Sequence, residues 1–223
     1  MTIFYEPSHQ PSRRYFLEHL KPIFINLYNL IDFNFNPAGR IEIKNDNITC
    51  PGGEIQCEMM KIHACVIDYY WNDGSNFTDH NRQHVFDFIW CTMKNVRSLD
   101  KPDDLGELCA NKYLDGFEQW QTINLCAKTE KSIALLKNFK DETHSSNLGD
   151  ISKPNFPIVI FNQGTNNSQI VNDTEQVKQK ICDHFVSLSL KFSYYFNNNF
   201  FPSSIIRMNI INQIIVPKMN RFQ

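Results

Sequence analysis

The spacing of apolar and polar residues predicts that the chain starts with a strand and a helix. Residues 2–5 (TIFY) form a short β-rich run that ends in a polar turn. From Ser12 the apolar residues recur at three- and four-residue intervals, which predicts a helix with Ser12 as its N-cap. Pro22 lies within this pattern and should kink or divide the helix. Alternation over 31–35 and 40–44 then predicts two strands that pair as a hairpin.

The rest of the pattern is mostly helical and then returns to strands. Residues 50–145 carry helical stripes together with most of the cysteines. The apolar run 156–163 (FPIVIFNQ) predicts a buried strand, and 166–172 has room for one more strand at an edge. Thr174 is expected to cap a final amphipathic helix.

This succession of elements predicts an α/β protein with a thioredoxin-like fold and a disulfide-bearing helical insertion. The N-terminal part supplies strand, helix and strand, and the C-terminal part supplies two strands and a helix. An aromatic, Asn-rich segment follows. The predicted parts are 1–49 (thioredoxin-like N-terminal part), 50–145 (helical cysteine-bearing insertion), 146–192 (thioredoxin-like C-terminal part) and 193–223 (C-terminal segment).

Composition narrows the class of function. The 223 residues include 22 basic and 24 acidic side chains, a net charge of −2 without a long basic run, so nucleic acid is not an expected partner. No apolar stretch is long enough for a membrane-spanning helix, so no membrane insertion is expected. Because residues 2–5 are already strand-like, we expect numbering to start near a mature N-terminus, with any signal peptide absent.

The seven cysteines predict an exported, disulfide-bonded protein. The odd one is Cys182, expected as a buried free thiol or as an intermolecular disulfide that makes a homodimer. The others suffice for three structural disulfides, whose pairing the sequence leaves open. These six are Cys50, Cys57, Cys65, Cys91, Cys109 and Cys126.

Four N-glycosylation sequons agree with export, although an Asn-rich chain produces some by chance. We therefore expect a secreted or extracellular protein, with a lysosomal location as the alternative. The sequon residues are Asn47, Asn76, Asn166 and Asn172.

The cysteine and histidine residues do not predict a metal centre, and no cofactor is expected. A zinc site formed by His63 with the first three cysteines would lack the usual short spacing between cysteine ligands. His80 and His84 are one helical turn apart, but no third ligand accompanies them, so a solvated helix face is the better interpretation.

The most specific motif is the segment CPGGEIQCEMMKIHAC, which begins at Cys50. It resembles C-Q-H-G-x-x-E-C-x-x-N-x-x-x-x-C, the signature of the gamma-interferon-inducible lysosomal thiol reductase (GILT) family. All three cysteines and Gly53 match in register. The departures are Pro51 for Gln, Gly52 for His, Gln56 for Glu and Met60 for Asn.

The start of the chain is similar to the family's opening pattern, Y-Y-E-S-L-C-x-x-C-R-x-F. Tyr5, Glu6 and Arg13 match, but His9 and Ser12 stand where the family has its two catalytic cysteines. The resemblance implies a soluble, glycosylated, secreted or lysosomal protein from a family that reduces protein disulfides at acidic pH. It also places Pro157 at the position of the cis-proline of thioredoxin-like proteins.

The replaced cysteines decide the expected chemistry. Disulfide reduction needs a thiolate that attacks and a second thiol that resolves the mixed disulfide. His9 cannot form that disulfide and Ser12 cannot resolve it, so this position should not run the reaction. A hydrolase in which Ser12 is the nucleophile and His9 the base lacks a visible orienting group.

Three functions remain from the sequence. The first is a secreted GILT-like protein without reductase activity that binds an extracellular protein or cell-surface ligand, through the groove around His9 and Pro157 or the aromatic tail. The alternative is a residual thiol–disulfide oxidoreductase that uses Cys50, Cys57 or Cys182. A structural or storage role is the third.

Peptide mapping without reduction, combined with thiol labelling, tests the cysteine prediction. We expect three intrachain bonds among the first six cysteines. The thiol label should then react with Cys182 alone, or with no cysteine if Cys182 forms a disulfide between two chains. Label on several of the six would instead indicate reactive or metal-binding thiols.

Overall fold

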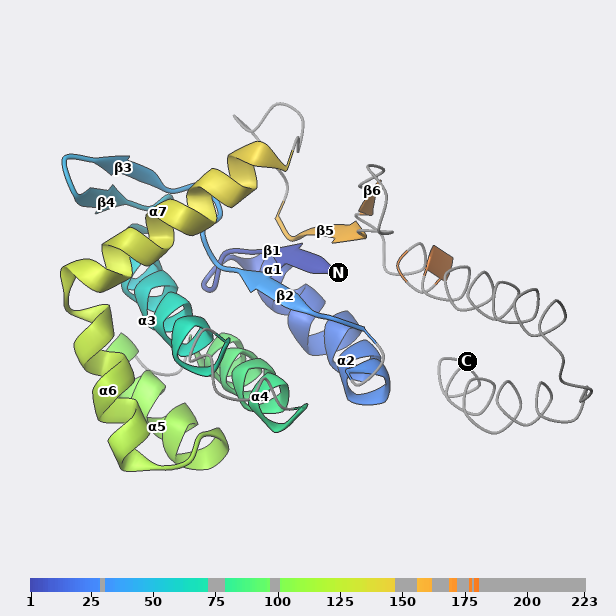
Figure 1. Cartoon of the computed structure of the whole chain (residues 1–223), viewed down its shortest axis with the longest axis horizontal. Coiled ribbons are helices and arrows are strands. Elements are labelled where there is room, and N and C mark those ends of the chain that lie inside the picture. Colours follow the sequence, from blue (N-terminus) through green and yellow to red (C-terminus); the bar gives the residue numbers. More distant parts are fainter. Residues whose placement is uncertain are drawn as a thin grey trace, which may run out of the picture.

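The computed structural model contains a small mixed sheet and a larger set of helices (Figure 1). The strands are β1 (Thr2–Phe4), β2 (Asn34–Asn36), β3 (Glu42–Lys44), β4 (Asn47–Thr49), β5 (Ile158–Phe161) and β6 (Gln169–Val171). The helices are α1 (Gln10–Arg14), η1 (a π-helix, Tyr15–Leu20), α2 (Lys21–Leu27), α3 (Gly53–Trp71), α4 (Asp79–Asn95), α5 (Pro102–Tyr113), α6 (Phe117–Ala127) and α7 (Glu130–Ser145). The structure describes residues 1–28, 31–71, 79–96, 101–146, 156–161, 169–171, 177 and 179–180.

The main sheet confirms the predicted fold class. Its strand order is β2-β1-β5-β6, with β1 parallel to β2 and antiparallel to β5, and with β6 antiparallel to β5 at the edge. The helical insertion lies between the first two and the last two of these strands, as the sequence predicts for a thioredoxin-like fold. The peptide bond between Phe156 and Pro157 is cis and immediately precedes β5.

The predicted hairpin is wrong in its pairing. β2 pairs with β1, and the strand within 40–44 pairs with β4 instead. Asn45 and Asp46, which connect β3 to β4, have φ values of 49° and 63°. Positive φ at both central residues is typical of the two-residue turn that matches the twist of a hairpin. This local turn fixes the partner of β3.

The predicted helix start is also wrong. α1 begins at Gln10, its N-cap is His9, and Pro11 lies in the first turn, where a missing N–H costs nothing. Ser12 is inside the helix and fully buried. Its Oγ accepts a hydrogen bond from the backbone N–H of Glu6 at 3.3 Å, so it stabilises the preceding turn.

Aromatic side chains form the centre of the core on the helical side of the sheet. Phe24 stacks on Phe86 with ring centroids 3.9 Å apart. Both rings lie near Phe35, and Phe86 also lies near Phe16. These rings come from α2, α4, η1 and β2, so they join the first helix, the insertion and the sheet. Pro22 stands in the first turn of α2, directly after the π-helix, and the helix is divided there as predicted.

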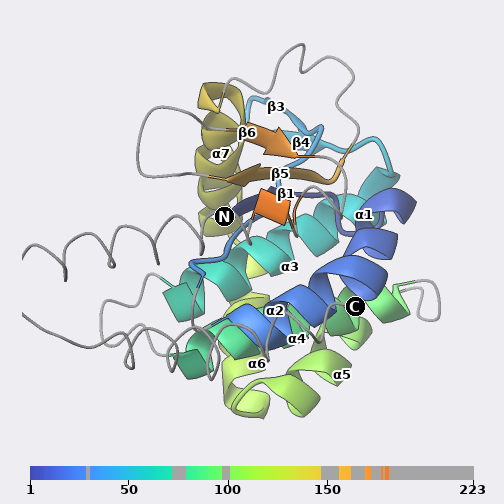
Figure 2. The same ribbon diagram turned by 90° about the vertical axis from the view of Figure 1, so that its right-hand side faces the viewer.

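The insertion is a packed group of helices joined by disulfides. α3 contacts α4, α6 and α7, and α5 contacts α4 and α6 (Figures 1 and 2). Two bonds link helices of this group, α3 to α6 and α4 to α5, and the third links the end of the β3–β4 hairpin to the start of α3. The pairs are Cys65–Cys126, Cys91–Cys109 and Cys50–Cys57.

α7 covers the other face of β2. Asn36 donates its side-chain N–H to Phe139 O at 2.8 Å and to the carboxylate of Glu142 at 3.0 Å, and Asn34 donates to the same carboxylate at 3.3 Å. Asn34 and Asn36 share a face because side chains alternate along a strand. The sheet therefore lies between α7 and the aromatic core.

Several predicted features lie outside the described residues: the thiol Cys182, the sequons at Asn76, Asn166 and Asn172, and the segment 193–223. Asn47 is described and exposed at the start of β4. None of the helices in the described part of the chain is both long and apolar enough to cross a bilayer.

The three disulfides should differ in their contribution to stability because they close loops of different length. Their sequence separations are 61 for Cys65–Cys126, 18 for Cys91–Cys109 and 7 for Cys50–Cys57. Removing each pair by double Cys→Ala substitution should lower the free energy of unfolding by about 4, 3 and 2 kcal/mol respectively. Denaturant unfolding measures this, and an inverted ranking would contradict the loop-closure account.

Candidate functional site

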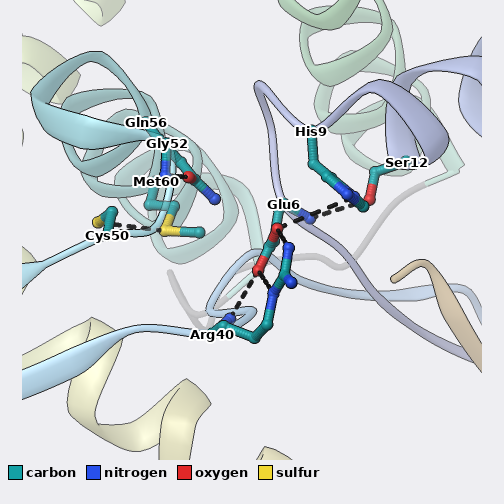
Figure 3. Close-up of polar contacts among 8 residues, drawn as sticks. All are labelled: Glu6, His9, Ser12, Arg40, Cys50, Gly52, Gln56 and Met60. Carbon is teal, nitrogen blue, oxygen red and sulfur yellow. Dashed lines mark hydrogen bonds and ion pairs between the residues drawn. The ribbon is translucent and has the colours of Figure 1, made fainter. Parts of the chain in front are cut away.

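The residues that stand in place of the catalytic pair lie where the turn after β1 leads into α1: His9 is the N-cap and Ser12 is in the first turn of the helix. His9 N donates to Glu6 O at 3.1 Å, and Arg13 N donates to His9 O at 3.0 Å, so the turn leads directly into the helix. Figure 3 shows Glu6 and His9 on this turn and Ser12 in the helix that follows. His9 is about one quarter exposed, at 28%, whereas Ser12 is fully buried. Only one of the two replacing residues therefore reaches the surface.

Glu6 is a buried carboxylate beneath this turn, and Arg40 neutralises it. Oε1 of Glu6 accepts hydrogen bonds from Arg40 N at 2.8 Å and Nε at 2.9 Å, and Oε2 accepts from Nη2 at 2.8 Å. Gly39 allows this approach, because a Cβ there would overlap Glu6 Cγ. Burial raises the pKa of Glu6, but the hydrogen bonds and charge of Arg40 outweigh it and lower the pKa overall. Glu6 is therefore ionised.

His9 is weakly coupled to this ion pair. Its Nδ1 lies 3.8 Å from Glu6 Oε2, beyond hydrogen-bond distance. Burial lowers the pKa of His9, and although the charge of Glu6 opposes this shift, the pKa stays below its ordinary value. Within the described residues, no hydrogen bond joins His9 to Ser12. With Ser12 buried and Glu6 committed to Arg40, the arrangement does not form a nucleophile, base and orienting acid.

Arg13 connects the site to the insertion. Its Nε donates to Met93 O at 2.6 Å and its Nη2 donates to Lys94 O at 3.3 Å, in the last turn of α4. These carbonyls at a helix C-terminus lack partners within the helix, and a cation is favourable there. Arg13 thus fixes the orientation of α1 relative to α4.

His63 lies in a buried polar network below the site. Nδ1 of His63 is 3.0 Å from Tyr5 Oη, and Nε2 is 2.8 Å from Thr92 Oγ1. Thr92 donates its only hydroxyl proton to Ile89 O, so it must accept from His63 Nε2–H, and Nδ1 accepts from Tyr5. Burial lowers the pKa of His63 to about 3, in agreement with this neutral tautomer. Both ring nitrogens are occupied, which leaves none for a zinc ion.

His84 does not lie on a solvated helix face, and that interpretation is wrong. Its Nδ1 hydrogen-bonds with Tyr113 O, and its Nε2 is 3.4 Å from Asp115 Oδ1, with the side chain only 15% exposed. The polar neighbours come from the end of α5 and the following turn, which no periodicity within α4 reveals. The side chain of His80 lies outside the described part of the structure.

The Cys50–Cys57 bond lies near the turn but is covered. The two residues are only 7% and 9% exposed. Cys50 Sγ is 3.8 Å from Met60 Sδ, so an apolar thioether is its neighbour where the GILT signature has Asn. Attack on a disulfide requires access along the S–S axis, and these sulfurs offer little.

The fold and the site define a thioredoxin-like protein. Its first helix begins where a thiol reductase of this fold carries its reactive cysteines, but this chain has His9 and Ser12 there. The family model described as gamma interferon inducible lysosomal thiol reductase (GILT) matches residues 1–113, about half of the chain. The chain belongs to this family.

Two curated relatives agree with that assignment. "GILT-like protein 1" of Drosophila melanogaster is 25% identical over 186 residues, which cover 79% of this chain and 70% of the relative. The "Gamma-interferon-inducible lysosomal thiol reductase-like protein" of Anopheles gambiae is 25% identical over 146 residues, which cover 64% of this chain and 59% of the relative.

The Arg40–Glu6 pair predicts a pH-dependent loss of stability. The pKa of Glu6 is lowered on folding, so the pair stabilises the fold above the ordinary pKa of 4.5 and loses this effect as the pH falls through the lower folded value. Arg40→Leu should lower the free energy of unfolding by about 2 kcal/mol near neutral pH. This is less than the loss of one partner from a fully buried pair would cost, because water reaches Arg40. The cost should shrink in acid, where Glu6 of the variant becomes neutral.

Urea unfolding at neutral and acidic pH measures this, with Arg14→Leu as the matched control. Arg14 forms an exposed pair with Glu18, so its loss should leave the free energy of unfolding nearly unchanged. An Arg40→Leu cost that stays constant with pH would show that packing of the side chain, not its charge, is responsible.

Proposed function

We propose that this GILT-family protein does not catalyse thiol–disulfide exchange at the first helix and acts by binding another protein. One observation carries the proposal: the position of the catalytic pair is occupied by the imidazole of His9 and the buried hydroxyl of Ser12. Neither group can form or resolve a mixed disulfide. In this proposal the chain lacks only the two catalytic thiols, because the strand, turn and helix that would present them are formed.

The remaining cysteines of the described chain support the same conclusion. All six are in disulfides, and the Cys50–Cys57 bond near the turn is buried. A helix N-terminus lowers a thiol pKa and makes it reactive, but Cys57 lies in the second turn of α3 with its sulfur already bonded. A residual oxidoreductase that used Cys50 and Cys57 would first have to expose and reduce this bond.

The surface around the turn is the proposed contact region. Gln10 and Pro11 are exposed, Ser8 and His9 are partly exposed, and Pro157 is partly buried. We propose an extracellular or lysosomal protein as the partner, because three disulfides persist only in an oxidising compartment. In that compartment Asn47, exposed in its sequon, would be available for glycosylation.

An insulin disulfide reduction assay tests the absence of activity. The wild-type protein should not accelerate reduction above the background of the reductant, at neutral or acidic pH. The double variant H9C/S12C places two thiols at the start of α1 and should gain activity, because the helix start stabilises an attacking thiolate.

The controls separate the alternatives. Turnover by the wild type that disappears in C50A/C57A would establish the residual oxidoreductase and overturn the proposal. A wild type without turnover and an H9C/S12C variant that is folded yet inactive would show that the site has lost more than its two cysteines.

A further inference from the structure

The indole ring of Trp90 brings two positive charges together where α2 and α4 lie side by side (Figures 1 and 2). Nζ of Lys21, the first residue of α2, is 3.4 Å from the centroid of this ring. Nζ of Lys94, one turn after Trp90 on α4, is 5.0 Å from the same centroid. The ring attracts both cations through its π electrons. Lys94 is exposed, and Lys21 and Trp90 are partly exposed, so the arrangement lies at the surface.

Neither ammonium group is neutralised within the described part of the chain. Lys21 and Lys94 make contact with the indole ring but form no hydrogen bond or ion pair with a described residue. The indole N–H of Trp90 is a third donor, and it has no partner among the described residues either. Asp87 is one turn before Trp90 on the same face of α4. Burial raises the pKa of Asp87 and the charge of Lys21 opposes this shift, but the two groups form no ion pair.

Two like charges at one ring repel each other, and an anion placed between them would replace this repulsion by two attractions. A carboxylate fits this position because its two oxygens accept charge-assisted hydrogen bonds from two separate ammonium groups. The exposed side chain of Ile25, one turn after Lys21 on the same face of α2, adds an apolar contact beside the cations.

The surrounding charges favour a short acidic segment over a long polyanion. Glu18 is one turn before Lys21 and Asp87 is one turn before Trp90, so negative charges lie on both helices next to the two lysines. The whole chain has a net charge of −2 and no long basic run. A densely charged polymer would therefore meet repulsion as soon as it extended beyond the lysines.

We propose that the surface formed by Lys21, Ile25, Trp90 and Lys94 binds an acidic segment of a partner protein, an inference that rests on the proposed binding function. One carboxylate of the partner lies between the two ammonium groups, and a neighbouring apolar side chain packs on Ile25. This Trp90 surface is separate from the turn that carries His9, so it adds a second contact region and names the chemistry of the partner.

An NMR titration with the capped tripeptide acetyl-Glu-Leu-Glu-amide tests the Trp90 surface. The indole N–H resonance of Trp90, assigned with the variant Trp90→Phe, is the reporter. We expect a saturable shift whose apparent affinity falls as the salt concentration rises. Lys21→Gln and Lys94→Gln should each weaken binding about two- to fivefold, as expected for an exposed ion pair, and the double variant should weaken it further.

Two controls accompany this titration. Lys112→Gln is the matched variant, because Lys112 also lies over an aromatic ring, 5.2 Å from the centroid of Tyr113, but without a second lysine. Its affinity for the peptide should equal that of the wild type. The neutral peptide acetyl-Gln-Leu-Gln-amide should not produce the shift.

Three results would overturn the proposal: no saturable shift, an equal shift with the neutral peptide, or unchanged affinity in the double lysine variant. Tighter binding of a heparin oligosaccharide that depends on both lysines would identify a sulfated glycan and also overturn it. The insulin assay is independent of these results. A wild type that neither reduces insulin nor binds the peptide would refute the Trp90 surface and leave the loss of catalysis standing.

Discussion

Ionisation of Glu6 beneath the first turn is the constraint on which the geometry of the site depends. A buried carboxylate must be paired, and here one residue, Arg40, supplies three hydrogen bonds to it. That pairing requires a glycine at position 39 and places the chain after β2 against the turn after β1. The turn itself is then completed by Ser12, which accepts from Glu6 N–H. The site is thus held by charge and hydrogen bonds that do not involve sulfur.

These contacts explain how the fold can persist without cysteines at positions 9 and 12. Arg13 on α1, His63 on α3 and the aromatic rings of the core hold the helix start in place through contacts that the catalytic positions do not share. An imidazole at position 9 and a hydroxyl at position 12 are therefore compatible with the same architecture. Function belongs to the site and the fold does not guarantee it.

The sequence predicted the strands and helices well where the pattern was long or strongly apolar. The strand after Pro157, the edge strand β6 and the division at Pro22 follow from local patterns that tertiary structure did not override. The partner of β3 was missed because the Asn45–Asp46 turn was not recognised as a hairpin signal.

The site was less predictable because its contacts are between residues far apart in the sequence. The prediction of Ser12 as an N-cap rests on residue type alone. In the structure its hydroxyl oxygen accepts a hydrogen bond from the backbone N–H of Glu6. Nothing in the sequence marked Arg40 as the partner of Glu6, although the family match at Glu6 marked the carboxylate itself. The cysteine pairing likewise depends on which helices are neighbours, which composition and count do not determine.

The positions of the disulfides have a consequence for how the molecule opens. All three bonds fall between residues 50 and 126, so in the described chain none crosses from the helical insertion to the β1–β2–β5–β6 sheet. Disulfides cross-link the insertion. Its packing against the sheet depends on noncovalent contacts, made by Arg13, His63, Asn36 and the stacked rings. The two halves should therefore exchange their amide hydrogens as separate cooperative units, with the sheet as the earlier to open.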